Sequence, residues 1–412
     1  MCTFLLKETV AYYTRNDSSV YSVFLDATKA FDRINYAKLF NRLVAKKLPV
    51  VVIRFLLNLY SEQLMCVQWD CTKSSRFQVC NGVKQGAIIS PVLFCIYVDD
   101  LLHRLRAANV GCFIGNIYAG CMAYADDLTL LAPSAHTMRI MLQICSDYAK
   151  EYSVSFNAKM FTPGRASSYP LRPLFYIDDN VIEYVESWPH LGNILNVNQS
   201  DAACILNRRN IMVGQINDVI CYFGKLDPIV KTELLYTYCS SLYGSVLWDL
   251  QQPELDRICT AWRMALKRLW WLPFNTHRDI VSALSGRQPM FDELCVRFVN
   301  FHFTCLCSRN RTVSELTRLA MADEGAQSHH GRNLRFISSI YNLKYNWLCQ
   351  TDGRNETLTQ IRRHGHDRHS NSDVTSFSVL LELIMVRDGI LDLAGQFSKS
   401  EIELMIWNLC TN

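Results

Sequence analysis

The sequence is first informative for what it lacks. No apolar stretch approaches the roughly 20 residues that a bilayer-spanning helix needs, and no secretory signal opens the chain. Its 17 cysteines are scattered, odd in number and without the paired spacing of zinc sites. They indicate buried thiols in a reducing compartment and exclude a disulfide framework. We therefore expect a soluble protein of the nucleus, the cytoplasm or both, with no membrane partner.

Neither sign of charge dominates the composition. Lys and Arg number 42 and Asp and Glu number 38, which gives a net charge of +4. This balance permits nucleic acid binding without requiring it. A chain of 412 residues, 50% of them hydrophobic, can bury more than one core, so we expect two or three domains. The oligomeric state stays open.

The most informative stretch is residues 121–131, where two adjacent carboxylates, Asp126 and Asp127, stand between two short apolar runs. Each run is too short for a helix and suits a strand, so we expect a hairpin with both carboxylates at its tip. Two like charges this close are unfavourable unless cations neutralise them, which suggests a divalent metal. A surface loop with two solvated acids is the alternative.

Two earlier segments carry further candidate residues. Residues 20–25 form an apolar run that ends at Asp26, which suits a central strand. Asp26 then stands either at a catalytic position or at a helix cap. Residues 81–91 form a loop with two glycines, in which Ser90 is expected to cap a helix that begins at Pro91.

That helix contains a second copy of the same pattern. Residues 97–100 read Tyr-Val-Asp-Asp and residues 124–127 read Tyr-Ala-Asp-Asp. On a helix, Asp99 and Asp100 diverge by about 100° and cannot converge on one metal. We therefore assign the chemistry to Asp126 and Asp127.

Together these segments resemble the A, B and C motifs of reverse transcriptases, and most of all those of LINE-type, non-LTR retrotransposons. The matching stretches are residues 23–32, residues 81–91 and residues 124–127, in the family's order. Farther along, Leu191 and Gly192 resemble the primer grip, and residues 239–248 and 261–273 resemble the helical segment downstream of the polymerase.

The resemblance implies an α+β fold: a polymerase palm, with an antiparallel sheet and packed helices, then a helical thumb and a helical C-terminal region. It implies two Mg²⁺ ions, with Mn²⁺ as a substitute, and as partners an RNA template, a DNA primer and deoxynucleoside triphosphates. The catalytic residues would be Asp26, Asp126 and Asp127, joined as metal ligands by the carbonyl of Ala27. The nucleotide would be bound by Phe31, Lys84, Gln85, Gly86, Tyr124 and Lys159, with Phe31 under the sugar to select deoxynucleotides. Leu191 and Gly192 would contact the primer.

Two departures from the family pattern matter. Only about two dozen residues precede Asp26, so the basic finger segments are largely missing, which suggests an N-terminally truncated or decayed copy. The motif that usually reads Asn, two residues, then Lys has Met160 at the expected lysine and Lys159 one place early. No endonuclease-like region is present. We therefore expect feeble polymerisation by the isolated chain.

We divide the chain into a palm over residues 1–200, a thumb-like region over 201–310 and a helical, partly disordered tail over 311–412. Basic residues interleaved with tryptophans suit a thumb that follows a nucleic acid backbone, although a bundle with a basic outer face explains them equally. In the tail, disorder is expected over residues 353–373, in preference to zinc at His364, His366 and His369.

The sequence is interpreted as an RNA-directed DNA polymerase. The alternative is a catalytically inactive, nucleic-acid-binding remnant with the same fold. A viral RNA-dependent RNA polymerase is disfavoured, because such enzymes tend to carry a small or acidic residue where Phe31 stands.

Overall fold

The computed structural model describes residues 1–162, 173–322 and 328–370. It divides into two compact units. A palm unit comprises residues 2–188 and 196–199, and a helical unit comprises Met1, residues 189–195 and the described residues from 200 onward. No helix in the described ranges combines the length and hydropathy of a membrane span.

The palm unit is built on a sheet of five strands in the order β13–β10–β1–β9–β8. The central strand β1 (Tyr21–Ala27) pairs antiparallel with β9 (Asp127–Ala132) on one side and β10 (Phe156–Phe161) on the other. The outer strands are β8 (Cys121–Tyr124) and β13 (Glu183–Tyr184), the latter parallel to β10. The predicted α+β fold is confirmed; the sheet is antiparallel as expected from β10 to β8, whereas β13 joins it in parallel.

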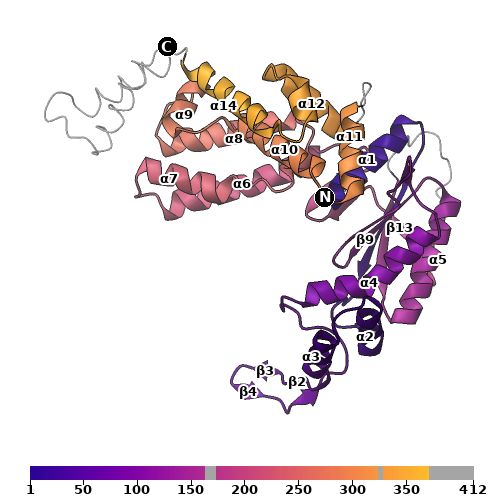
Figure 1. Ribbon diagram of the computed structural model, residues 1–412. Coiled ribbons are helices and arrows are strands. Elements are labelled where there is room, and N and C mark those ends of the chain that lie inside the picture. Colours follow the sequence, from indigo (N-terminus) through magenta and orange to yellow (C-terminus); the bar gives the residue numbers. More distant parts are fainter. Residues whose placement is uncertain (163–172, 323–327, 371–412) are drawn as a thin grey trace, which may run out of the picture. The chain divides into compact units, whose positions relative to one another are not determined.

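Helices cover both faces of this sheet. Helices α4 (Ser90–Ala107) and α5 (Ala135–Tyr152) lie along one face, shown in Figure 1, and bury Val23, Leu25 and Ala27 of the central strand. Helix α1 (Cys2–Arg15) contacts β8, where the Sγ of Cys2 lies 3.6 Å from the carbonyl oxygen of Ala123. On the other face of β1, the ring of Phe24 is buried and stacks with Phe161 and Trp188.

The remaining elements of this unit are short. Helices α2 (Tyr36–Ala45) and α3 (Val50–Ser61) precede two small ladders, in which β2 (Leu64–Met65) pairs with β5 (Phe77–Gln78) and β3 (Gln68–Trp69) pairs with β4 (Thr72–Lys73). The other two-stranded ladders are β6 (Phe113–Ile114) with β7 (Ile117–Tyr118), β11 (Tyr176–Ile177) with β12 (Asn180–Val181), and β14 (Ser187–His190) with β15 (Asn193–Asn196).

Two helix starts show how local sequence sets the boundaries. The side chain of Asn35 caps α2 by accepting a hydrogen bond from the backbone N–H of Lys38 at 3.1 Å. Ser90 was expected to cap α4, and that expectation is wrong. Its hydroxyl instead donates to the carbonyl oxygen of Lys84 at 2.6 Å, and Ile89 occupies the capping position. Ser90 therefore closes the preceding loop rather than the helix.

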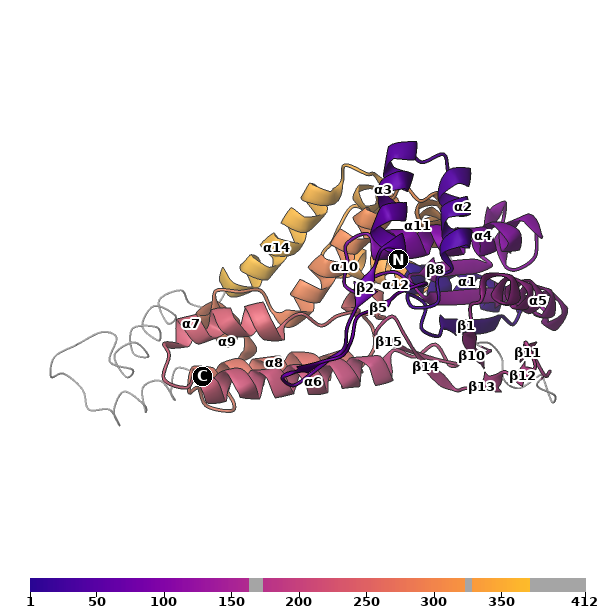
Figure 2. The same ribbon diagram turned by 90° about the horizontal axis from the view of Figure 1, so that it is seen from below.

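The helical unit has one continuous hydrophobic core. Its α-helices are α6 (Ala202–Tyr222), α7 (Pro228–Leu234), α8 (Glu254–Leu269), α9 (Arg278–Ser285), α10 (Met290–Leu306), α11 (Arg311–Ala322), α12 (His329–Ile340), α13 (Tyr345–Cys349) and α14 (Arg354–Ser370). A π-helical turn, Leu235–Cys239, and a 3₁₀ turn, Ser245–Leu247, lie between α7 and α8. Helices α6 and α8 run side by side, and α10 packs against α11 and α14 (Figure 2).

Helix α14 corrects an expectation. Disorder was expected over residues 353–373, yet residues 354–370 are helical, while 371–373 lie outside the described residues. The segment has low mean hydropathy, but Thr357, Leu358 and Ile361 are buried, the last two in the core of the helical unit. Few apolar residues suffice here because they fall on one face of the helix.

Candidate active site

The hairpin at residues 121–132 is confirmed. Strand β8 ends at Tyr124, β9 begins at Asp127, and these two residues are register partners. The turn between them consists of Ala125 and Asp126, and Ala125 has a φ of 52°, in the left-handed region. Such a tight turn directs two successive carboxylates to one end of the sheet.

One face of the sheet gathers four candidate side chains in a row. Asp26 on β1 is the register partner of Asp127 on β9 and of Asn157 on β10, and Tyr124 continues the row on β8. Directly opposed residues on antiparallel strands have Cβ atoms about 5 Å apart, on the same face. The strand order thus brings Asp26 and Asp127 together from distant parts of the chain. Asn157 is a member of the row that the sequence did not assign to the site.

The third carboxylate joins the pair through the backbone. The N–H of Ala27 donates to the carbonyl oxygen of Asp126 at 3.3 Å. The carbonyl oxygen of Ala27 accepts from Ala30 at 3.2 Å, and a carbonyl oxygen has a second lone pair for another partner. All three carboxylates therefore lie at the same end of strands β1 and β9.

Burial and neighbouring negative charges both act on the carboxylates of this cluster. Loss of surrounding water, and then the neighbouring carboxylate of Asp126, raise the pKa of Asp26 above its ordinary value. The pKa of Asp127 is also raised, first by burial and then by the charges of Asp126 and Asp26. A cation at this end of the sheet would relieve the repulsion.

The donor set suits magnesium. No group of three or more His, Cys, Asp or Glu side chains in the described residues is gathered into a ready metal cage. Magnesium does not require one, because it usually keeps several waters and is held by one or two carboxylates together with substrate phosphates. Two opposed carboxylates with a third beside them fit that mode of binding.

The loop that follows β1 is packed against the glycine loop. The N–H of Val83 donates to the carbonyl oxygen of Phe31 at 2.7 Å. Gly82 has a φ of 83°, and a Cβ there would lie 2.8 Å from the carbonyl oxygen of Asp32. Only glycine permits this approach. The ring of Phe31 is half-buried, 5.3 Å from the ring centroid of Phe94.

The other glycine-loop candidates are exposed. Lys84, Gln85 and Gly86 all face solvent, and Gly86, with a φ of 82°, has no neighbour within 4 Å of a built Cβ. The amide of Gln85 donates to Oδ1 of Asp32 at 3.0 Å. Asp32 therefore positions Gln85, a role that the sequence did not reveal because the two residues belong to different motifs.

Strand alternation explains the apparent shift at Lys159. Lys159 is the register partner of Phe24 on β1, two residues from Asp26, so it lies on the same face as Asp26. Its Nζ is paired with Oε2 of Glu183. Met160 points to the other face and is 0% exposed within the palm core. Position 159, not 160, is thus the position on the candidate site's face.

The second Asp-Asp pair has a different role. Asp99 and Asp100 lie within α4, as predicted, and both form ion pairs. Asp100 pairs with Arg42 of α2 and with Arg104 at 2.8 Å. Asp99 pairs with Lys46, and its Oδ2 lies 3.3 Å from Nε2 of His103. These contacts join α2 to α4, so the second copy of the motif is structural.

The candidate primer-contacting residues form the turn between β14 and β15. Leu191 and Gly192 have φ angles of 47° and 74°. The hydroxyl of Tyr243 donates to the carbonyl oxygen of Leu191 at 3.1 Å, and Nη2 of Arg208 donates to that of Gly192 at 2.5 Å. Arg208 also stacks over the ring of Tyr243 at 5.2 Å. Tyr243 stood in a segment matched to the family, but Arg208 had no signal in the sequence.

In the thumb-like region, the tryptophans and the basic residues occupy different places. Trp262 and Trp270 are buried and belong to the core, whereas Trp271 is 55% exposed. An open cavity of about 440 Å³ between α6 and α8 is lined by Arg209, Val213, Ile216, Asn217, Asp256, Arg257, Thr260, Ala261, Met264, Ala265 and Arg268. The basic side chains thus border a groove instead of alternating with exposed tryptophans.

Comparisons with known proteins find a family match within the palm unit. Residues 3–160 match the family described as reverse transcriptase (RNA-dependent DNA polymerase). The Pol polyprotein of the type-2 retrotransposable element R2DM of Drosophila melanogaster is 33% identical over 184 residues, which is 42% of this chain and 17% of the relative. The probable RNA-directed DNA polymerase of the X-element of the same fly is 23% identical over 329 residues, 74% of this chain and 34% of the relative.

The RNA-directed DNA polymerase of the Drosophila melanogaster mobile element jockey is 24% identical over 285 residues, 64% of this chain and 30% of the relative. The chain thus spans about a third or less of the length of these relatives. A solved telomerase structure from Candida albicans, in complex with a telomeric RNA fragment, aligns with 95% of this chain and 53% of its own, with 12% identity and a TM-score of 0.30. Residues 3–160 therefore match a reverse transcriptase domain, and the curated relatives that the chain resembles are polymerases and Pol polyproteins of retrotransposable elements.

Proposed function

We propose that this chain acts as an RNA-directed DNA polymerase, which extends the 3′-hydroxyl of a DNA primer with deoxynucleoside triphosphates on an RNA template. The observation that carries the proposal is the register of the central sheet. It sets Asp26 opposite Asp127, with Asp126 hydrogen-bonded to the same strand end. With nucleic acids and nucleotides as substrates, the reaction takes place in the nucleus or the cytoplasm.

The carboxylates serve to hold divalent metal. Asp26, Asp126, Asp127 and the carbonyl of Ala27 would hold two magnesium ions, or manganese in their place, which when bound lower the pKa of the primer hydroxyl and neutralise the triphosphate. The raised pKa values of Asp26 and Asp127 support this role, because burial first and the neighbouring carboxylates second disfavour their charged forms, and a bound cation would offset both effects.

The neighbouring loops position the nucleotide. Phe31 lies beneath the sugar, held by the backbone hydrogen bond to Val83, and excludes a 2′-hydroxyl. Lys84, Gln85 and Gly86 present an exposed edge to the incoming base and template. On the sheet, Tyr124 extends the row of the carboxylates, and Lys159 lies one row farther on.

The helical unit holds the nucleic acid. Arg209, Arg257 and Arg268 border the groove between α6 and α8, where they would contact backbone phosphates. Leu191 and Gly192 would contact the primer, and Tyr243 and Arg208 hold their turn in place. We expect binding of primer–template by this unit to weaken steeply as salt is raised.

Primer extension on an RNA template with magnesium tests the proposal, and the chain supplies its own matched control. Asp126→Asn alters the hairpin copy of the Tyr-x-Asp-Asp motif, whereas Asp99→Asn makes the same change in the helical copy. We expect feeble extension by the wild type, a loss of at least about 100-fold from that level in Asp126→Asn, and activity within a few-fold of wild type in Asp99→Asn.

Two results would contradict the proposal. Equal loss in both variants would show that the hairpin has no special role in the reaction. Absence of extension by the wild type, with salt-sensitive binding of primer–template retained, would favour the inactive nucleic-acid-binding remnant.

A further inference from the structure

A second pocket of the helical unit is lined by none of the residues assigned above to polymerisation. It encloses about 200 Å³ between α8, α9 and the start of α10. Its floor is apolar and includes Cys259, Trp262, Leu266, Val281 and Met290, all of them buried. An apolar cavity of about 150 Å³ holds one benzene ring, so this volume suits a flat, bicyclic ring system.

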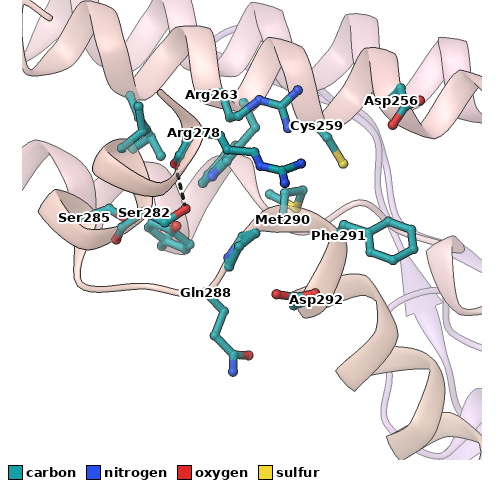
Figure 3. A pocket seen from close by; sticks show the side chains of 15 residues that line it. Asp256, Cys259, Arg263, Arg278, Ser282, Ser285, Gln288, Met290, Phe291 and Asp292 are labelled. Carbon is teal, nitrogen blue, oxygen red and sulfur yellow. Dashed lines mark hydrogen bonds between the residues drawn. The ribbon is translucent and has the colours of Figure 1, made fainter. Parts of the chain in front are cut away.

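Two arginines from different helices meet at this pocket. Figure 3 shows the side chains of Arg263, from α8, and Arg278, from α9, lying next to each other with their guanidinium groups directed the same way. Arg263 donates one hydrogen bond, from Nη2 to Oγ1 of Thr260 at 3.0 Å, out of the five donors that a guanidinium carries. Paired guanidinium groups are a frequent arrangement for binding phosphate.

The pocket also contains a buried acceptor. Asp292, only 2% exposed, lines the wall at the start of α10. Its Oδ1 accepts a hydrogen bond from the hydroxyl of Tyr341 at 2.5 Å. Its Oδ2 is buried and has no hydrogen-bond partner within the described residues. Leaving a buried carboxylate oxygen unpaired costs free energy, which a ligand with an N–H donor would recover.

An apolar slot, a pair of guanidinium groups and a buried carboxylate together match the parts of one nucleotide. The flat ring occupies the slot, the phosphate meets the arginines, and the donor edge of the base meets the carboxylate. Among the standard bases, guanine presents two neighbouring N–H donors, at N1 and N2, and Oδ2 of Asp292, which has no partner in the described residues, can accept from this edge.

We propose that this pocket binds a single unpaired guanine nucleotide, with its phosphate on Arg263 and Arg278 and its N–H edge on Asp292. Unpaired bases splayed into protein pockets and recognised by their edges are a common mode of binding to single-stranded nucleic acid. The nucleotide can belong to an RNA or a DNA strand. The site does not depend on catalysis at the palm.

The test is isothermal titration calorimetry of the full chain with mononucleotides. The probes are GMP, dGMP, AMP, CMP, UMP and unphosphorylated guanosine. We expect GMP to bind about tenfold more tightly than AMP, CMP or UMP, since one good pair of hydrogen bonds discriminates bases by about that factor or more. Comparison of GMP with dGMP distinguishes an RNA source of the nucleotide from a DNA source.

Three variants separate the parts of the site. Asp292→Asn should reduce the preference for GMP to within about twofold, because the amide presents a donor where the base needs an acceptor. Arg263→Gln should weaken every mononucleotide but leave guanosine unchanged. Asp256→Asn, at an exposed carboxylate on the same pocket, is the matched control and should leave the preference intact.

Binding of all mononucleotides with equal affinity, or no binding at millimolar concentration, would overturn the proposal. So would loss of the preference in Asp256→Asn to the same extent as in Asp292→Asn. If Asp292→Asn does not fold, the ranking of nucleotides by the wild type and the behaviour of Arg263→Gln decide the matter. Asp126→Asn should bind GMP with the affinity of wild type. The guanine-site proposal can therefore fail without the polymerase proposal failing, and the reverse.

Discussion

A buried histidine pair in the helical unit should make that unit sensitive to acid. His302 on α10 and His330 on α12 are 0% and 4% exposed, and Nδ1 of His302 lies 2.9 Å from Nε2 of His330. Nε2 of His302 lies 2.9 Å from the carbonyl oxygen of Leu348, which can only accept. His302 therefore carries its proton on Nε2, and its Nδ1 accepts from His330. Both rings are held neutral.

Burial lowers the pKa of His302 from 6.5 to about 4. Burial, and then the neighbouring His302, also hold the pKa of His330 well below its ordinary value. Above pH 6.5 neither the folded nor the unfolded chain binds the proton on His302. Between pH 6.5 and about 4, only the unfolded chain binds it, so stability falls as the pH falls. Each pKa unit is worth about 1.4 kcal/mol, so His302 alone removes about 2 kcal/mol between pH 6.5 and 5.

Thermal unfolding followed by tryptophan fluorescence, at pH 7.5 and pH 5, measures this effect. A loss of about 2 kcal/mol lowers the melting temperature of a unit of this size by about 4–8 °C. His302→Gln keeps a donor for Leu348 and an acceptor for His330 but does not titrate, so its melting temperature should depend less on pH. His136→Gln, at an exposed histidine of α5, is the control. Identical pH dependence in the wild type and His302→Gln would refute the reasoning.

Three further predictions follow from the palm unit. Phe31→Ala should allow ribonucleotides to be used in primer extension without impairing the use of deoxynucleotides. If single-turnover kinetics show the same discrimination between the two sugars as in wild type, Phe31 has a packing role only. Met160→Lys should destabilise the palm by several kcal/mol instead of restoring a catalytic lysine, because position 160 is fully buried; a chemical-denaturation midpoint equal to wild type would contradict this. Gly82→Ala should cost about 1–3 kcal/mol through its φ of 83° and the clash with Asp32, and a melting temperature unchanged from wild type would show that the loop adjusts freely.

Local patterns predicted the elements well. The apolar run before Asp26 became the central strand, and the two short runs around Asp126 became a hairpin. The Asp-Asp pair at residues 99–100 fell on a helix. In each case the hydrophobic period and the turn residues lie within about a dozen residues of one another, which a sequence displays directly.

Features that depend on distant partners were missed. From the motif spacing, Lys159 was interpreted as displaced by one residue. Motif spacing does not show which side chains of β10 lie on the same face as Asp26. The register of β10 against β1 shows that Lys159 does. Ser90 was expected to cap its helix, but its acceptor is the carbonyl of Lys84 in a loop whose path was unknown. Arg208 supports the Leu191–Gly192 turn from a helix that carries no motif.

The central position of β1 also governs how the site can form. Asp26 and Asp127 are register partners separated by 101 positions along the chain (127 − 26), and the contact of β1 with β10 spans a still longer segment. Pairings between residues so far apart form slowly, because a long loop must close before they contribute any stability. During synthesis, β1 therefore has no partner strand in this sheet until β9 has been made. In that interval both edges of an apolar strand are unpaired, and unpaired strand edges promote aggregation. The three carboxylates can therefore meet only after the chain has been made well beyond β1, at least to the end of β9.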